Sequence, residues 1–133
     1  MTDFATVVAV LGVVGTFASV FVAAWEFRRK THLEIFCAYT KKYNEIIRPE
    51  IYADWQAALE GDQKYWEKLK PVMIQYLNLI WEEAYLREAG IVPDRIWSIW
   101  EKEIKPVLKA EFTKRVLKEY KFHYGETWLK KFE

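Results

Sequence analysis

An uncharged run of 22 residues, Phe4–Trp25, most constrains what this chain can fold into. Its only polar side chains belong to Thr6, Thr16 and Ser19. At about 1.5 Å of rise per residue, a helix of this length covers roughly 33 Å, which is enough to cross the hydrocarbon core of a bilayer. A buried helix of a soluble protein is the alternative, but such helices usually show a polar face or are shorter. The run therefore predicts a single transmembrane helix.

The charges that flank the run predict its orientation. Asp3 precedes it, whereas Arg28, Arg29 and Lys30 follow it closely, and basic residues mark the cytoplasmic end of a membrane helix. Trp25 is expected to lie with these three at the membrane interface. A cleaved signal peptide would need a basic start and a shorter apolar region. We therefore expect an uncleaved single-pass protein of the cell inner membrane, with its N-terminus outside and its C-terminal domain in the cytoplasm.

Small residues recur along one face of the predicted membrane helix. They form a small-residue stripe with alternating spacings of four and three: Ala5, Ala9, Gly12, Thr16, Ser19 and Ala23. Small side chains let helix backbones approach closely in a membrane, so the stripe predicts a homo-oligomer. Because such residues are common in any membrane helix, a helix without this contact is the alternative. If four or more helices pack, the hydroxyls of Thr16 and Ser19 would line a narrow polar path.

The composition of the remaining chain predicts one small folded domain. The protein has 133 residues, of which 52% are hydrophobic and 17% aromatic, and this excludes a disordered chain. The single cysteine, Cys37, excludes an internal disulfide framework. Although the net charge is only +1, basic residues dominate over 26–48 and from residue 102 onward, and acidic residues dominate over 50–101. The basic blocks either face anionic lipid or phosphate or form solvated helix faces.

The apolar spacing predicts an all-α chain in three parts. These are an external N-terminus with the transmembrane helix (1–25), a helical stem (26–48) and a cytoplasmic helical bundle (49–133). Asp62 and Asp94 are expected to cap helices of the bundle. Prolines and glycines are expected to end, kink or begin the helices, at Pro49, Gly61, Pro71, Gly90, Pro106 and Gly125.

One stretch of the bundle resembles a known family. The residues are Tyr-Leu-Asn-Leu-Ile-Trp-Glu-Glu at 76–83, then Tyr-Leu at 85–86, Gly-Ile at 90–91, and a W-x-x-W pair at 97 and 100. The pattern is similar to that of small, mostly uncharacterised bacterial and phage proteins with one N-terminal membrane helix and a cytoplasmic helical domain. The resemblance implies this fold and no assigned reaction. Some membrane proteins of similar layout act in prokaryotic antiviral systems, which is an analogy of layout.

Two adjacent glutamates are the first candidates for a site. Glu82 and Glu83 point about 100° apart on a helix, so they form no catalytic pair by themselves. With Asn78 and Arg87 they form either a buried structural network or a ligand site. The sequence lacks zinc-ligand spacing, an EF-hand loop, a P-loop and a glycine-rich dinucleotide turn. We therefore predict no metal, no cofactor and no enzymatic activity.

Aromatic and basic residues near the C-terminus suggest a second candidate site. Trp97 and Trp100 share a helix face, where they either pack in the core or stack on a base. Lys114, Lys118 and Lys121 would then contact phosphates or lipids; the alternative is a basic solvated face. Duplex nucleic acid is not expected as a partner, because no binding motif accompanies the basic residues.

These observations favour a non-enzymatic, inner-membrane-anchored helical protein that self-associates through its membrane helix. Its cytoplasmic domain would bind a nucleotide signal or a protein partner and pass that event to the bilayer. A narrower form is a pore-like effector of an antiviral system. The rival hypothesis is a passive anchor or accessory subunit that docks another protein.

Overall fold

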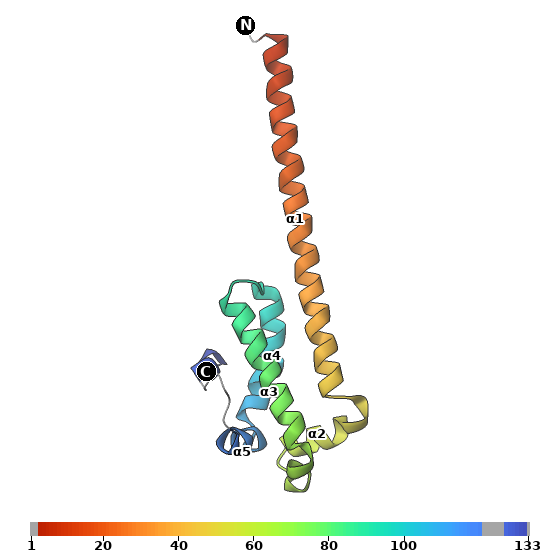
Figure 1. Cartoon of the computed structure of the whole chain (residues 1–133), viewed down its shortest axis with the longest axis vertical. Helices are drawn as coiled ribbons and strands as arrows, with labels where there is room; N and C mark the ends of the chain where they lie inside the picture. The colour runs from red at the N-terminus through yellow and green to blue at the C-terminus, as the bar shows by residue number, and fades with distance from the viewer. Residues whose placement is uncertain (1–2, 121–126, 133) are drawn as a thin grey trace. The chain divides into compact units, whose positions relative to one another are not determined.

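The computed structural model describes residues 3–120 and 127–132, and these residues are 89% helical and contain no strand. This confirms the all-α prediction. The described residues form five α-helices and three short 3₁₀ helices. Their order is α1 (Phe4–Ile46), η1 (Pro49–Ile51), α2 (Tyr52–Leu59), η2 (Gln63–Tyr65), α3 (Trp66–Glu88), α4 (Asp94–Lys109), α5 (Glu111–Glu119) and η3 (Thr127–Phe132), and Figure 1 labels the α-helices.

The chain divides into an N-terminal unit, Met1–Glu34, and a helical domain, Ile35–Glu133. The division falls inside α1, within the predicted stem. Residues 35–46 of α1 belong to the helical domain because they contribute to its core, through Ile35, Phe36, Tyr39, Tyr43 and Ile46. The stem predicted over 26–48 is therefore shared between the two units. As predicted, α1 ends before Pro49: Arg48 is extended, and Pro49 begins η1.

The N-terminal unit is a stretch of α1 whose described side chains are nearly all exposed, including the entire apolar run Phe4–Trp25. Among the described residues, α1 is the one helix long and apolar enough to cross a membrane. Two hydroxyls of the run bond within the helix. Thr16 donates to the Gly12 carbonyl and Ser19 to the Gly15 carbonyl, each at 2.9 Å.

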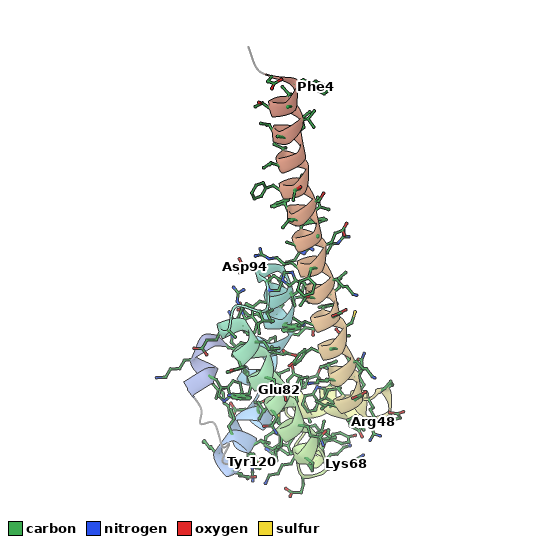
Figure 2. All side chains as sticks on the ribbon, turned by 45° about the horizontal axis from the view of Figure 1, so that its top comes forward. Phe4, Arg48, Lys68, Glu82, Asp94 and Tyr120 are labelled. Carbon is green, nitrogen blue, oxygen red and sulfur yellow. The ribbon has the colours of Figure 1, made fainter. Side chains whose placement is uncertain are left out.

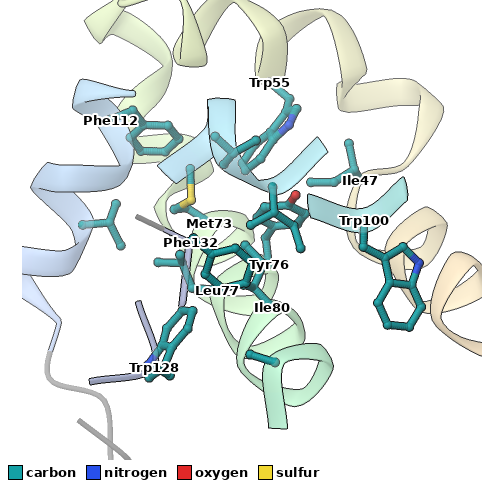
Figure 3. Packing of buried hydrophobic residues seen from close by; sticks show 14 of the residues in the cluster. Ile47, Trp55, Met73, Tyr76, Leu77, Ile80, Trp100, Phe112, Trp128 and Phe132 are labelled. Carbon is teal, nitrogen blue, oxygen red and sulfur yellow. The ribbon is translucent and has the colours of Figure 1, made fainter. Parts of the chain in front are cut away.

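The core of the helical domain forms around one stripe of α3. Its members are Leu69, Met73, Tyr76 and Ile80, each at most 4% exposed. Their spacings of four, three and four place them on one helix face. α5 contacts α2, α3 and α4, and Figure 3 shows aromatic rings from α2 and α5 near this stripe. Burial of this stripe is what assembles the short helices, since helices of eight or nine residues are marginal alone.

Pro71, which was expected to kink or restart a helix, and Pro106, which was expected to begin one, both lie inside helices. α3 does not restart at Pro71, and α4 continues past Pro106 to Lys109. An interior proline costs about 3 kcal/mol. Leu69 and Met73, on either side of Pro71, are both buried, so tertiary packing outweighs that cost. The break expected at Pro106 occurs instead at Ala110, which is extended, and the buried Thr113 hydroxyl donates to the Val107 carbonyl across it.

The capping predictions had mixed outcomes. The Asp62 carboxylate accepts a hydrogen bond from the Lys64 amide at 3.3 Å, as expected at a helix start. Gly90 follows α3 with a φ of +78°, as expected, because a residue with a β-carbon is strained there. The prediction for Asp94 was wrong: its side chain makes no cap bond to α4 and pairs with Arg87 instead.

The packing around Phe112 gives a stability prediction. This ring is 1% exposed and lies against Trp55 and Trp66, with centroid distances of 6.2 and 5.8 Å. Phe112→Ala should lower the free energy of unfolding by about 3–5 kcal/mol, because it leaves a cavity in a close-packed core. Urea unfolding of the full chain in mild detergent measures this. The control Tyr85→Ala, at a 59% exposed ring, should cost about 1 kcal/mol or less, and equal losses would contradict the assignment of the core.

Candidate functional site

The helical domain contains a cavity of about 270 Å³ between the 36–44 stretch of α1 and helices α3 and α4. Its lining is acidic and aromatic, and no lysine, arginine or histidine contributes to it. We call it the acidic–aromatic cavity. It is lined by Phe36, Tyr39, Thr40, Tyr43, Asn44, Tyr76, Glu83, Ile99, Trp100, Glu103 and Ile104.

Helical spacing brings these residues together. On α1, Tyr39 and Tyr43 are one turn apart and therefore face the same side. On α3, Glu83 lies three residues after Ile80, so it continues the buried stripe of that helix. On α4, Glu103 lies three residues after the buried Trp100. Glu83 thus occupies a position at which the spacing predicts an apolar side chain, whereas Glu103 is exposed next to the buried Ile104.

Glu83 is the most unusual residue of the cavity. It is 6% exposed, and neither a hydrogen bond nor an ion pair joins its carboxylate to another described residue. Burial, together with the negative charges of Glu103 and Glu82, raises its pKa from 4.5 to about 8. The side chain is therefore mostly protonated at neutral pH, with its polar atoms at the cavity.

Aromatic rings form the walls of the cavity. Tyr39 and Trp100 have centroids 5.5 Å apart, and Tyr43 meets Tyr76 edge to face at 5.9 Å. Figure 3 shows Tyr76 and Trp100 among the buried residues. Burial raises the pKa of all three tyrosines, so their hydroxyls stay protonated at physiological pH. The faces of these rings carry the negative end of an aromatic quadrupole, which favours a cation.

The arrangement indicates what the cavity can hold. Two carboxyl groups and electron-rich rings, without a basic residue, suit a cationic group or a neutral hydrogen-bond donor and disfavour an anion. Among the described residues no group of three or more His, Cys, Asp or Glu side chains is arranged to hold a metal ion. The cavity therefore fits an organic cation better than a metal.

The other residues of the predicted site lie elsewhere. Glu82, on α3 (Figure 2), is partly exposed; it pairs with Lys42 at 3.2 Å and accepts from the Tyr39 hydroxyl at 3.4 Å. Asn78 and Glu82 share a surface depression that does not include Glu83. Arg87 donates to the Val92 carbonyl at 2.9 Å and pairs with Asp94, so it fixes the α3–α4 connection. Sequence reasoning joined these residues because they are neighbours along the chain.

The second candidate site from the sequence does not form a binding platform in the structure. Trp97 and Trp100 are 9% and 6% exposed, so they belong to the core, which was the alternative expectation. The Trp97 indole donates to Glu101 at 2.8 Å. Lys114 pairs with Glu111 on the exposed side of α5, and Lys118 is also exposed. Lys121 lies outside the described residues.

Sequence reasoning did not single out the cavity tyrosines or Glu103 as site residues. The sequence feature that could have identified the site is an acidic residue at a helix position where the spacing predicts a buried apolar side chain. Glu83 extends the buried series of α3, whereas Glu103 is exposed beside the buried face of α4. An acidic residue within the buried series of α3 would have indicated a polar cavity.

Comparison of the chain with protein-family models finds no match, and comparisons with curated proteins and with solved structures find no significant match. The family resemblance noted from the sequence therefore stays a prediction. Function has to be argued from the geometry of the chain itself.

The pKa of Glu83 predicts a pH-dependent stability. Between pH 4.5 and about 8 the folded chain holds a proton that the unfolded chain releases, so stability falls as the pH rises through this window. The slope approaches about 1.4 kcal/mol per pH unit. Glu83→Gln removes this proton uptake and should flatten the urea-unfolding profile by about 2–4 kcal/mol between pH 5 and pH 8.

Glu82→Gln is the matched control for this measurement. It changes the neighbouring residue in the same way but alters a partly exposed group, so the slope should be retained. A slope in Glu83→Gln equal to that of the wild type would contradict the raised pKa.

Proposed function

We propose that this chain is a single-pass membrane protein whose helical domain receives a signal at the acidic–aromatic cavity and transmits it to the bilayer. The observation that carries the proposal is the make-up of α1. This one helix contains the apolar run Phe4–Trp25 and two of the cavity tyrosines, Tyr39 and Tyr43. A change at these tyrosines acts directly on the helix that enters the membrane.

The exposed apolar run supports membrane insertion. Phe4, Phe17 and Phe21 are each more than 70% exposed in the chain alone, and each large apolar side chain gains about 1.5–3 kcal/mol on leaving water. A bilayer supplies this burial along the whole run. At its basic end, the Arg29 guanidinium lies 5.7 Å from the centre of the Trp25 ring, a pairing suited to the membrane interface.

The small-residue stripe supports self-association. A β-carbon added at Gly12 or Gly15 would meet no atom within 4 Å, so nothing within the chain requires glycine there. Glycine in a helix interior costs up to about 1 kcal/mol, and close approach of a second helix would offset that cost. The hydroxyl protons of Thr16 and Ser19 are bound within α1, so these side chains fit a contact between helices without needing water.

The charge of the cavity favours one chemical class of ligand over another. The cavity lining holds carboxyl groups and no base, and the neighbouring Lys42, 4.6 Å from the centre of the Tyr39 ring, is paired with Glu82. This lining disfavours the phosphates of a nucleotide, so a cationic molecule is a better occupant than the nucleotide signal expected from the sequence. The narrower hypothesis of a pore-like antiviral effector rests on the layout of the chain alone.

The orientation can be tested with the single cysteine. Cys37 is exposed and unpaired, and it follows the basic end of the apolar run. A membrane-impermeant maleimide should label it only after bacterial cells expressing the full chain are lysed. Asp3→Cys in a Cys37→Ser background should be labelled in intact spheroplasts. Labelling of Cys37 in intact cells, or release of the protein from membranes by alkaline carbonate, would contradict the proposed topology.

The oligomeric state tests the small-residue stripe. Gly12→Leu with Ser19→Leu should convert a defined oligomer in nanodiscs into smaller species, because two bulky side chains separate the backbones. Light scattering gives the protein mass. The matched control Val14→Leu with Phe21→Leu changes the opposite face and should keep the oligomer. A wild-type monomer would favour the passive anchor, and an unchanged mass in the stripe variant would exclude packing through this face.

A further inference from the structure

The Glu83 carboxyl group lies in the cavity without a partner. Buried polar groups are normally hydrogen-bonded, because leaving one without a partner lowers stability. Glu83 is 94% buried, since 6% of its surface is exposed, and no described residue donates to it or pairs with it. The oxygens of Glu83 are not among the described side-chain atoms that are fully enclosed and unsatisfied, so they reach the cavity, where a donor from outside the chain, either water or a ligand, can bond to them.

The surroundings of Glu83 select the chemistry of that donor. Tyr39 and Tyr43 from α1, Tyr76 from α3 and Trp100 from α4 present aromatic rings to the same space. Phe36, Ile99 and Ile104 add apolar surface. An ammonium group satisfies a carboxylate with charged N–H donors and is attracted to ring faces, and a hydrocarbon group attached to it suits the apolar wall.

The size of the cavity limits the ligand. An apolar cavity of about 150 Å³ holds benzene. The acidic–aromatic cavity measures about 270 Å³, so it has room for one ring or a short chain in addition to an ammonium group. A metal ion is a poorer fit because no described group of three acidic, His or Cys side chains surrounds such a position.

We propose that the acidic–aromatic cavity binds a small primary amine, with the ammonium group on the Glu83 carboxylate and the apolar group against Phe36, Ile99 and Ile104. This inference rests on the proposed function, because it names the signal that the helical domain receives. Glu103, which is exposed at the same cavity, adds a second negative charge near the ammonium group.

Binding is coupled to one proton. The empty site holds Glu83 in its neutral form at pH 7, and the amine arrives as an ammonium ion, so formation of the ion pair releases the carboxyl proton to solvent. The titratable groups around Glu83 are Glu103 from α4, Glu82 and Tyr76 from α3, and Tyr39 and Tyr43 from α1. Affinity should therefore rise by about tenfold per pH unit as the pH increases toward 8.

The test is calorimetric titration of the full-length protein in nanodiscs with 2-phenylethylamine. We expect saturable binding at pH 8 that weakens as the pH is lowered to 6. The neutral analogue 2-phenylethanol should bind at least tenfold more weakly, because it brings no charge to Glu83. Absence of saturable amine binding, or equal binding of the alcohol, would overturn the proposal.

Two pairs of variants locate the site. Glu83→Gln should reduce amine affinity at pH 8 by tenfold or more and remove its pH dependence, whereas the control Glu82→Gln should retain both. Ile99→Trp should fill the cavity and block binding, whereas Ile91→Trp, at an exposed residue outside the cavity lining, should not. Wild-type affinity in both Glu83→Gln and Ile99→Trp would overturn the proposal.

The calorimetric titration tests amine binding, and separate experiments test membrane insertion and assembly, so the two proposals can fail independently. Maleimide labelling and oligomeric mass do not depend on amine binding. A protein that inserts and assembles but binds no amine would overturn this inference alone. A protein that binds the amine but fails to insert would overturn the membrane assignment alone.

Discussion

The structure of the helical domain depends on the burial of one stripe of α3. Leu69, Met73, Tyr76 and Ile80 are almost inaccessible, and the short helices α2 and α5 gain their stability by helping to cover them. Glu83 is the next residue of the same stripe, and the packing that buries its apolar neighbours also buries its carboxyl group. The burial of this stripe therefore produces both the core and the cavity. It also raises the pKa of Glu83, because a charged carboxylate is disfavoured at a buried position.

Much of the fold could be predicted because it follows from local rules. The uninterrupted run from Phe4 gave the long first helix, Pro49 marked its end, and Gly90 supplied the left-handed residue after α3. The positions of Pro71 and Pro106 could not be predicted from local rules, because buried contacts on both sides of Pro71, and the Thr113 bond after Pro106, depend on distant parts of the chain.

The site was predicted only in part. The sequence identified the glutamate pair but not which member is buried, since adjacent side chains on a helix point in different directions. The register of α3 distinguishes them: Glu83 continues the apolar stripe, and Glu82 faces Lys42 at the surface. The contribution of Tyr39 and Tyr43 could not be foreseen, because it requires knowing that residues 35–46 of the long first helix pack in the helical domain.

The hydroxyl bonds of Thr16 and Ser19 have a mechanical consequence for the proposed assembly. Because both protons are donated to carbonyls of the same helix, these hydroxyls donate no hydrogen bond to a neighbouring helix. A contact through the stripe would then depend mainly on shape and dispersion, which vary smoothly as one helix rotates or slides against another. Such a contact would let one helix rotate or slide against another without breaking specific hydrogen bonds. This property suits the proposed transmission along α1, in which a change near Tyr39 and Tyr43 alters the packing of the membrane helix.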